Sequence, residues 1–232
     1  QVFILFYFTT RSTRTKNTNN LATKEGEMIF VLLLSLTPVF AADPIAPDTF
    51  AVTFTTDVKA PSNCTGSSCT SSFVINCKRK SAPLGVDRFH ALVKDGFYNN
   101  AAFFRVVPKF VAQFGIAGSP AENTKWNQTI QDDPVLGSNT VGTVTFATSG
   151  PNTRTTQLFI NTADNARLDK MGFAPFATLD DGLDIVTNID DPTPGDSNGI
   201  DQDQYATKGN KWLKKEYPKA NFILSATIKS IQ

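Results

Sequence analysis

The stretch from Phe103 to Gly115, FFRVVPKFVAQFG, constrains this chain more than any other. It places Arg105 inside an apolar run that Pro108 interrupts. A guanidinium carries a permanent charge, and burying a charge is costly unless it has partners. Two interpretations remain open. Arg105 is either an edge-strand residue whose head group extends to water, or a fixed hydrogen-bond donor at the rim of an apolar pocket.

Short alternating runs elsewhere in the chain predict β-strands. Residues 48–58 alternate phenylalanine and valine with threonine and alanine, and residues 73–78 repeat the pattern with Cys77 on the apolar face. Alternation with a period of two is typical of a strand that buries one face. We expect two strands here, with Cys77 acting as a small buried hydrophobic residue.

Two more strands are expected at residues 142–148 and 156–162, GTVTFAT and TQLFINT, joined by a turn that contains Gly, Pro and Asn. Side chains two positions apart on a strand share a face, so Gln157 and Phe159 point in the same direction. An amide and an aromatic ring are thereby placed side by side.

Residues 82–100 have the spacing of one amphipathic helix. Pro83 suits the first helical turn, apolar residues follow at helical intervals, and Gly96 suits the end. His90, the single histidine of the chain, lies in this segment. We expect it on the helix surface rather than in catalysis.

The amino-terminal region is predicted to be a targeting sequence. Met28 begins a segment with a short apolar core, residues 29–36, followed by small residues that suit cleavage before Ala42 or Asp43. This core is too short to span a bilayer, although a membrane anchor is the alternative. We expect residues 1–27 to be translated upstream sequence or a mis-set start, residues 28–42 to be a signal peptide, and residues 43–232 to be the mature domain.

A signal peptide would direct the mature domain into the secretory pathway: secreted, in the endoplasmic reticulum or endomembrane lumen, or in the periplasm if the source is bacterial. Such compartments are oxidising, so Cys64 and Cys69 are the expected disulfide, which closes a short loop. Pairing of Cys64 with Cys77 is the alternative. Asn63 and Asn127 each begin an Asn-X-Thr sequence that fits N-glycosylation.

The charge pattern argues against several classes of partner. The formal net charge is +1, and no basic stripe indicates a nucleic-acid partner. A single histidine excludes a histidine-rich metal site, and the acids of residues 190–204 lack the spacing of a calcium loop. We therefore expect no metal, no cofactor, no nucleic acid, and no membrane attachment after signal cleavage.

The pair of segments 103–115 and 142–169 resembles the cyclophilin-type peptidyl-prolyl cis-trans isomerases. Residues 172–176, GFAPF, fit the same family, and residues 208–228 are similar to a branch found in bacteria and some microbial eukaryotes. The resemblance covers about residues 48–229. Two long motifs in the right order and spacing are a stronger signal than one short pattern.

This resemblance implies a mainly-β fold, a closed eight-stranded antiparallel β-barrel with two capping α-helices. The sequence is compatible with it, because short alternating runs are separated by turn residues. We expect the second helix at residues 208–218, ended by Pro218, and a polar surface loop at residues 190–204.

The resemblance also implies the site. Arg105 would be the catalytic arginine, Gln113 would orient it and contact the substrate carbonyl, and Phe159 would complete the catalytic set. The implied substrate-binding residues are Phe104, Phe110, Val111, Ala147, Thr148, Gln157, Leu168 and Phe173. Arg167 stands where members that bind cyclosporin well have tryptophan, which argues against cyclosporin sensitivity but not against isomerase activity.

Rotation about an X–Pro bond suits such a site, because it requires no proton transfer or nucleophile. The expected function is a peptidyl-prolyl cis-trans isomerase that acts, as a monomer, on proline-containing client polypeptides of the secretory pathway. The alternative is a proline-binding chaperone module with little catalysis. A barrel that binds a small apolar ligand is weaker, since eight-stranded barrels are normally filled by side chains.

Overall fold

The computed structural model describes residues 43–59 and 71–229, which form eight strands and four α-helices. The strands are β1 (Thr49–Thr56), β2 (Ser71–Lys78), β3 (Arg105–Val107), β4 (Val111–Phe114), β5 (Thr143–Phe146), β6 (Leu158–Asn161), β7 (Pro175–Asp181) and β8 (Ile223–Lys229). The helices are α1 (Pro83–Lys94), α2 (Pro120–Lys125), α3 (Leu183–Thr187) and α4 (Gln202–Glu216), with 3-10 turns η1 (Arg79–Ser81) and η2 (Ala166–Met171).

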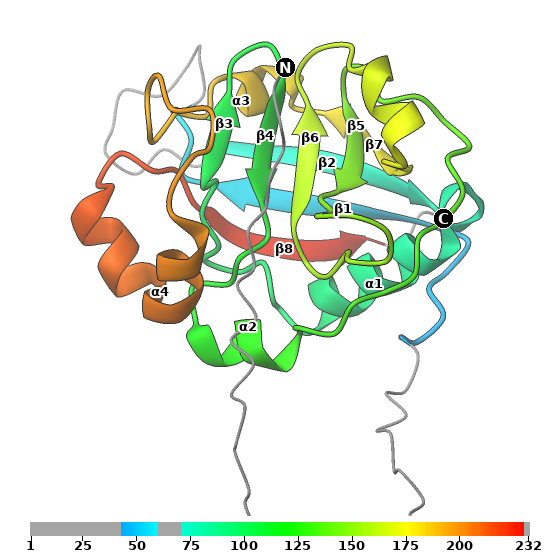
Figure 1. The fold of residues 1–232 in the computed structure, drawn as a ribbon, viewed down its shortest axis with the longest axis horizontal. Coiled ribbons are helices and arrows are strands. Elements are labelled where there is room, and N and C mark those ends of the chain that lie inside the picture. The colour runs from blue at the N-terminus through cyan, green and yellow to red at the C-terminus, as the bar shows by residue number, and fades with distance from the viewer. Residues whose placement is uncertain (1–42, 60–70, 230–232) are drawn as a thin grey trace, which may run out of the picture. The chain divides into compact units, whose positions relative to one another are not determined.

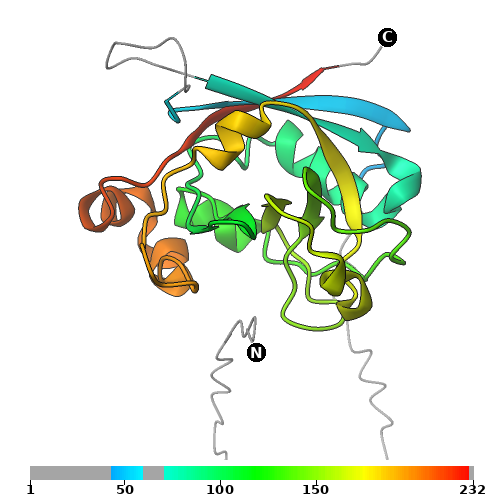
Figure 2. The same ribbon diagram turned by 90° about the horizontal axis from the view of Figure 1, so that it is seen from above.

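The strands form one antiparallel sheet in the order β3-β4-β6-β5-β7-β2-β1-β8. The sheet curls so that β3, β4, β6 and β5 lie across β2, β1 and β8 (Figures 1 and 2). Its interior is lined by the alternate side chains of each strand. The four strand regions predicted from the sequence are confirmed.

The predicted closed barrel is corrected to a curled half-barrel, because the edge strands β3 and β8 form no ladder with each other. They meet at one isolated bridge between Ala102 and Phe222. Two backbone bonds flank it, from Phe103 N to Asn221 O (3.0 Å) and from Ile223 N to Ala101 O (2.8 Å). The bridge precedes both β3 and β8, so the edges touch there and diverge beyond it.

Aromatic rings fill the space inside the curl. Phe54 of β1 stacks on Phe73 of β2 with ring centroids 5.0 Å apart and meets Phe114 of β4 edge-on at 5.7 Å. All three side chains are fully buried. Burying a phenylalanine stabilises a fold by roughly 1.5–3 kcal/mol, so these rings join both walls of the sheet. Cys77 is buried in the same core, where desolvation raises the pKa of its thiol.

Helix α1 begins at Pro83, as predicted, and ends at Lys94, with Asp95 as its C-cap before Gly96, whose φ is +73°. The surface position predicted for His90 is wrong, because this side chain is only 9% exposed. It packs edge-on against Phe50, with ring centroids 5.0 Å apart. The segment before β1 covers the helix: Asp43 pairs with Arg88 at 2.7 Å. His90 therefore lies on a face of the helix that other segments cover.

The two-helix expectation is corrected as well. Helices α1 and α3 lie at opposite ends of the curled sheet, and α4 lies beside β3 (Figure 1). Helix α4 begins at Gln202, earlier than predicted, and ends at Glu216, before Pro218. It bends at Gly209, which has φ +66° and ψ −164°. The polar loop predicted at residues 190–204 therefore ends at Asp201.

A second hydrophobic cluster fastens α4 to this side of the sheet. Its buried members are Ala102, Phe104, Ile116, Ile200, Tyr205, Leu213, Ala220 and Phe222. The Tyr205 hydroxyl accepts a hydrogen bond from the Ala102 amide at 2.9 Å. This cluster places the start of α4, and the loop before it, next to β3.

Several predicted features lie outside the described residues: segments 1–27 and 28–42, and Cys64, Cys69 and Asn63. Asn127 is described and exposed, as a glycosylation acceptor must be, and its modification stays a prediction. Within residues 43–59 and 71–229, no helix has both the length and the apolar character needed to cross a bilayer.

Candidate active site

Strands β3 and β4 place Arg105 opposite Gln113. The two residues are direct partners in the antiparallel register. Arg105 Nη1 donates a hydrogen bond to Gln113 Oε1 at 3.0 Å. Cross-strand neighbours on one face of a sheet are close enough for side chains to interact. The hairpin therefore brings together two of the three predicted catalytic residues.

The loop before α4 holds the other side of the guanidinium. Arg105 Nε donates to the Ser197 carbonyl oxygen at 2.6 Å. Gly199 has φ +78°, and a Cβ atom built there would lie 2.6 Å from both Arg105 Cβ and the Phe104 carbonyl oxygen. Only glycine allows the loop to approach β3 this closely.

The Arg105 side chain is therefore held in place, while one of its nitrogens is still accessible to a bound molecule. Its side chain is 6% exposed, and burial lowers the pKa of its guanidinium. An arginine remains charged at neutral pH despite such a shift. Among the described residues, Nη2 has no hydrogen-bond acceptor, and it is not among the polar atoms sealed from solvent. This nitrogen is free to donate to a bound molecule.

Apolar side chains surround the guanidinium. The Arg105 Cζ atom lies 5.6 Å from the centroid of the Phe110 ring. Phe159 is the direct partner of Gln113 between β4 and β6, and its ring meets Phe173 edge-on at 5.8 Å. The predicted pocket residues Phe110, Val111, Phe159, Leu168 and Phe173 are 2–8% exposed. Such low exposure leaves only a small part of each residue for contact with a ligand.

A chain of three glutamines extends from the arginine to α4. Arginine can only donate, so Gln113 must present Oε1 to it. Gln113 Nε2 then donates to Gln157 Oε1 at 3.0 Å, and Gln157 Nε2 donates to Gln202 Oε1 at 3.0 Å. The charge on Arg105 thereby fixes the orientation of every amide as far as the first residue of α4.

The predicted groove residues lie next to this chain. The Ala147 amide donates to the Gln157 carbonyl oxygen at 2.9 Å. The hydroxyls of Thr148 and Thr153 lie 2.8 Å apart, within the turn between β5 and β6. Thr148 is half-buried and Ala147 is buried. The part of the turn beside Gln157 therefore presents mainly backbone atoms and few side-chain atoms.

Phe104 is corrected from a substrate-binding residue to a core residue. It has no exposed surface and belongs to the cluster that fastens α4. Successive side chains along an extended chain point in opposite directions. Because Arg105 faces the candidate site, Phe104 faces α4.

Sequence reasoning missed three residues that shape the site: Ser197, Gln202 and Asn165. Asn165 is 1% exposed and donates from Nδ2 to the Phe110 carbonyl oxygen at 2.9 Å. Its Oδ1 accepts from Arg167 Nη1 at 3.1 Å, and the Arg167 Cζ atom lies 4.6 Å from the Phe110 ring centroid. No local pattern marks these residues, because Gln202 and Asn165 bond to the site through partners 45 and 55 residues away and Ser197 acts through its carbonyl.

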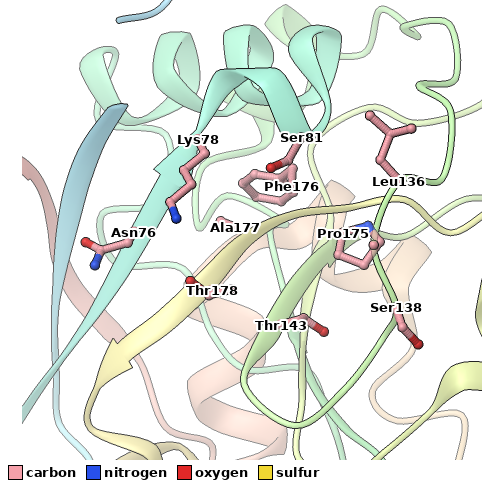
Figure 3. Close-up of a pocket in the computed structure, with 11 residues that line it drawn as sticks. Asn76, Lys78, Ser81, Leu136, Ser138, Thr143, Pro175, Phe176, Ala177 and Thr178 are labelled. Carbon is pink, nitrogen blue, oxygen red and sulfur yellow. The ribbon is translucent and has the colours of Figure 1, made fainter. Parts of the chain in front are cut away.

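A separate pocket of about 250 Å³ lies between β2, β7 and the loop that contains Leu136 (Figure 3). Lys78 is the only ionisable residue of its lining, and none of the predicted site residues borders it. Among the described residues, no group of three or more His, Cys, Asp and Glu side chains could hold a metal ion.

The half-barrel and the arginine-glutamine-phenylalanine set on β3, β4 and β6 define a cyclophilin-like domain. The chain belongs to the cyclophilin-type peptidyl-prolyl cis-trans isomerase family. The family model described as "Cyclophilin type peptidyl-prolyl cis-trans isomerase/CLD" matches residues 65–210.

Curated relatives agree with this family. The peptidyl-prolyl cis-trans isomerase of Acinetobacter baylyi is 35% identical over 121 residues, which are 50% of this chain and 64% of the relative. Isomerase A of Dickeya dadantii is 35% identical over 116 residues, 47% of this chain and 61% of the relative. Isomerase B of Escherichia coli is 34% identical over 139 residues, 56% of this chain and 84% of the relative. The chain thus spans a little under two thirds of the first two relatives.

A solved structure shares the fold. A cyclophilin-type isomerase of Cryptosporidium parvum superposes with a TM-score of 0.56 at 19% identity, covering 79% of this chain and 99% of that one. At this identity the similarity concerns the fold alone.

Proposed function

We propose that the protein is a peptidyl-prolyl cis-trans isomerase in which Arg105 stabilises the twisted X–Pro bond. One observation carries the proposal. Arg105 is held at Nε by Ser197 and at Nη1 by Gln113, while Nη2 has no acceptor within residues 43–59 and 71–229 and the Cζ atom lies 5.6 Å from the Phe110 ring centroid. A donor fixed in advance in an apolar setting stabilises developing charge without reorganising.

The energetic requirement is modest. The planar imide must cross a barrier of about 18–20 kcal/mol, which makes uncatalysed exchange take tens to hundreds of seconds. Exchange in milliseconds requires a barrier lower by roughly 6–7 kcal/mol, at about 1.4 kcal/mol for each tenfold in rate. Several hydrogen bonds and apolar contacts that strengthen in the transition state can supply this amount.

The residues have distinct roles in this mechanism. As the C–N bond twists, the proline nitrogen regains a lone pair, which the Arg105 guanidinium can hydrogen-bond more strongly than in the planar state. Phe110 and Phe159 contact the proline ring and exclude water. Gln113 orients Arg105 and contacts the substrate carbonyl. No proton is transferred, so turnover is expected to be flat from about pH 6 to 9, where arginine stays charged.

We further propose that the clients are proline-containing polypeptides of the secretory pathway and that the protein acts as a monomer. The short apolar core at residues 29–36 supports the first statement. The presence of every proposed site residue within one chain supports the second. Amino-terminal sequencing of the protein from its source tests the signal peptide, and retention of residues 1–41 would contradict it.

The function itself is tested by catalysed exchange of a short Ala-Pro peptide, measured by NMR without a coupling protease. Arg105→Lys is the informative variant, because a lysine keeps the charge but has a single nitrogen, which cannot occupy the positions of Nε, Nη1 and Nη2 at the same time. We expect a loss of at least about tenfold, on the scale of one removed transition-state donor, with unchanged thermal unfolding. A wild-type protein that binds the peptide without accelerating exchange would instead be a proline-binding chaperone module.

A further inference from the structure

The arginines of this protein divide into two groups by their partners. Five arginines lie in the described residues. Three form ion pairs: Arg79 with Asp87, Arg88 with Asp43, and Arg154 with Asp132 and Asp133. Within the described ranges, Arg105 and Arg167 have no carboxylate oxygen inside 4.0 Å. The two arginines without a counterion are therefore the two at the candidate site.

Both unpaired guanidinium groups lie against the same ring. The Cζ atoms of Arg105 and Arg167 are 5.6 Å and 4.6 Å from the Phe110 centroid. A cation–π contact offsets part of the cost of each charge but does not neutralise it. Like charges gathered at an apolar surface raise the local positive potential, which attracts an anionic ligand.

Arg167 is oriented, not merely exposed. Its Nη1 donates to Asn165 Oδ1 at 3.1 Å. The acceptor is fixed in turn, because Asn165 is 1% exposed and its Nδ2 donates to the Phe110 carbonyl oxygen and to Asn161 Oδ1. A guanidinium has five N–H donors, and four of those on Arg167 have no acceptor among the described residues. Its planar fork matches a carboxylate in two-point contact.

The acids nearest to Arg167 in sequence have other partners. Asp164 Oδ1 accepts from the Val141 amide at 3.1 Å. Asp169 accepts from the Ser138 hydroxyl at 2.6 Å and from the Asn139 amide at 2.9 Å. Both carboxylates are thus held by other donors, and neither lies within 4.0 Å of the Arg167 guanidinium. The missing counterion is therefore best supplied by a ligand.

We propose that Arg167 forms a subsite for a carboxylate, so that the protein prefers client segments with Asp or Glu directly before or directly after the proline. This inference rests on the proposed isomerase function and names its substrate class. Exposed ion pairs are weak, so the preference is expected to be about two- to fivefold in kcat/KM.

The test compares peptides that differ by one charge. One pair is Ala-Glu-Pro-Phe against Ala-Gln-Pro-Phe, and the other is Ala-Pro-Glu-Phe against Ala-Pro-Gln-Phe, all with blocked ends. Catalysed exchange is measured by NMR for the full chain. The wild type should favour the Glu peptide in at least one pair, and the ratio should fall toward one as NaCl rises from about 20 mM to about 500 mM, because salt screens exposed charges.

Charge reversal separates recognition from a structural effect. In the Arg167→Gln variant, kcat/KM for the Glu peptide divided by kcat/KM for the Gln peptide should fall to about one. In the Arg167→Glu variant, a peptide with Lys at the same position should become a better substrate than the Glu peptide. Lys109→Gln is the matched control, since Lys109 is an exposed cation next to Phe110 in sequence that makes no cation–π contact with the Phe110 ring. This variant should keep the wild-type ratio.

Two results would overturn the inference: equal turnover of Glu and Gln peptides by the wild type in both pairs, or a ratio that persists in Arg167→Gln. Failure of the proposed function has a different signature, which is no acceleration of any peptide. In that case the dissociation constants of the same peptide pairs are measured by chemical-shift titration. The ratio of the values for the Glu and Gln peptides then tests the carboxylate subsite.

Discussion

Arg105 and Gln113 are joined twice, once as register partners across β3 and β4 and once by a 3.0 Å hydrogen bond from Nη1 to Oε1. The backbone ladder sets the distance, and the side-chain bond sets the orientation of the guanidinium. The rest of the site is arranged around this pair. Ser197 fixes Nε, and Gln157 and Gln202 continue the hydrogen-bond chain to α4.

The direction of the glutamine chain gives a first prediction. Gln202 must accept a hydrogen bond from Gln157 Nε2. Gln202→Glu keeps an acceptor of similar length, whereas Gln202→Lys presents only donors. We expect Gln202→Lys to lower kcat/KM by about fivefold, the effect of about 1 kcal/mol for one lost hydrogen bond, and Gln202→Glu to have a smaller effect.

A neighbouring glutamine provides the control for Gln202. Gln204 lies on α4 but bonds to Asp201 and Lys208 instead of the site. Gln204→Lys should therefore leave kcat/KM unchanged. Side-chain amide resonances of Gln157 should shift in Gln202→Lys alone. Equal kinetics for Gln202→Lys and Gln202→Glu would show that the chain does not position the site.

The approach of the loop to β3 gives a second prediction. Gly199→Ala places a methyl group 2.6 Å from Arg105 Cβ, at a residue with φ +78°. Overpacking costs about 1–3 kcal/mol and a left-handed backbone about 1–2 kcal/mol more. Because the loop must retreat, Arg105 should also lose its bond to Ser197. We expect a lower melting temperature together with a loss of kcat.

A second glycine, Gly195, distinguishes the backbone cost of such a substitution from the overpacking cost. It lies in the same loop with φ +87°, but a Cβ atom there would meet nothing within 4 Å. Gly195→Ala should show the backbone cost in unfolding experiments and retain kcat. If both variants lose activity equally, the close approach of Gly199 has no special role.

Arg167 leads to a third prediction, about cyclosporin. In relatives that bind the drug well, a tryptophan is expected at this position, and here a guanidinium lies over the Phe110 ring instead. We expect the wild type to be inhibited weakly and Arg167→Trp to be inhibited at lower drug concentrations, because an indole offers an apolar face and one donor. Strong inhibition of the wild type, unchanged in Arg167→Trp, would contradict this expectation.

The buried histidine gives a fourth prediction, about stability. Desolvation by burial is the main cause that lowers the pKa of His90, with Lys94 adding to it and Asp87 opposing it. The unfolded chain, with a histidine pKa of about 6.5, then binds the proton more readily than the folded protein. The free energy of unfolding should therefore fall as the pH drops below about 6.5.

Urea denaturation at about pH 7.5 and about pH 5.8 measures this effect, since a histidine of the unfolded chain gains its proton within that window. His90→Phe, which keeps an aromatic ring against Phe50, should flatten the difference. An identical loss of stability in the variant would assign the pH dependence to other groups.

Local patterns predicted much of the fold. The alternating runs predicted β1 and β2, and the three residues that the resemblance implied as the catalytic set, Arg105, Gln113 and Phe159, lie on the neighbouring strands β3, β4 and β6. Alternation with a period of two is a property of a single strand, so it can be recognised without knowing which strands pair with it.

Long-range arrangements were not predictable in the same way. Ser197 is 92 residues from Arg105 and acts through its carbonyl oxygen, which every residue has. The incomplete closure of the sheet depends on how β3 and β8 diverge, and neither strand encodes this alone. His90 was misplaced because the segment that covers α1 is far from it in sequence.

The most direct test of the central claim is the cis-trans exchange rate of a proline peptide while it is bound, measured by NMR for wild type and Arg105→Ala. The claim predicts a loss of at least about a hundredfold in the bound exchange rate, within the range for removing one oriented transition-state donor, with similar peptide affinity and unfolding midpoint. A bound exchange rate that is the same in both proteins would contradict it.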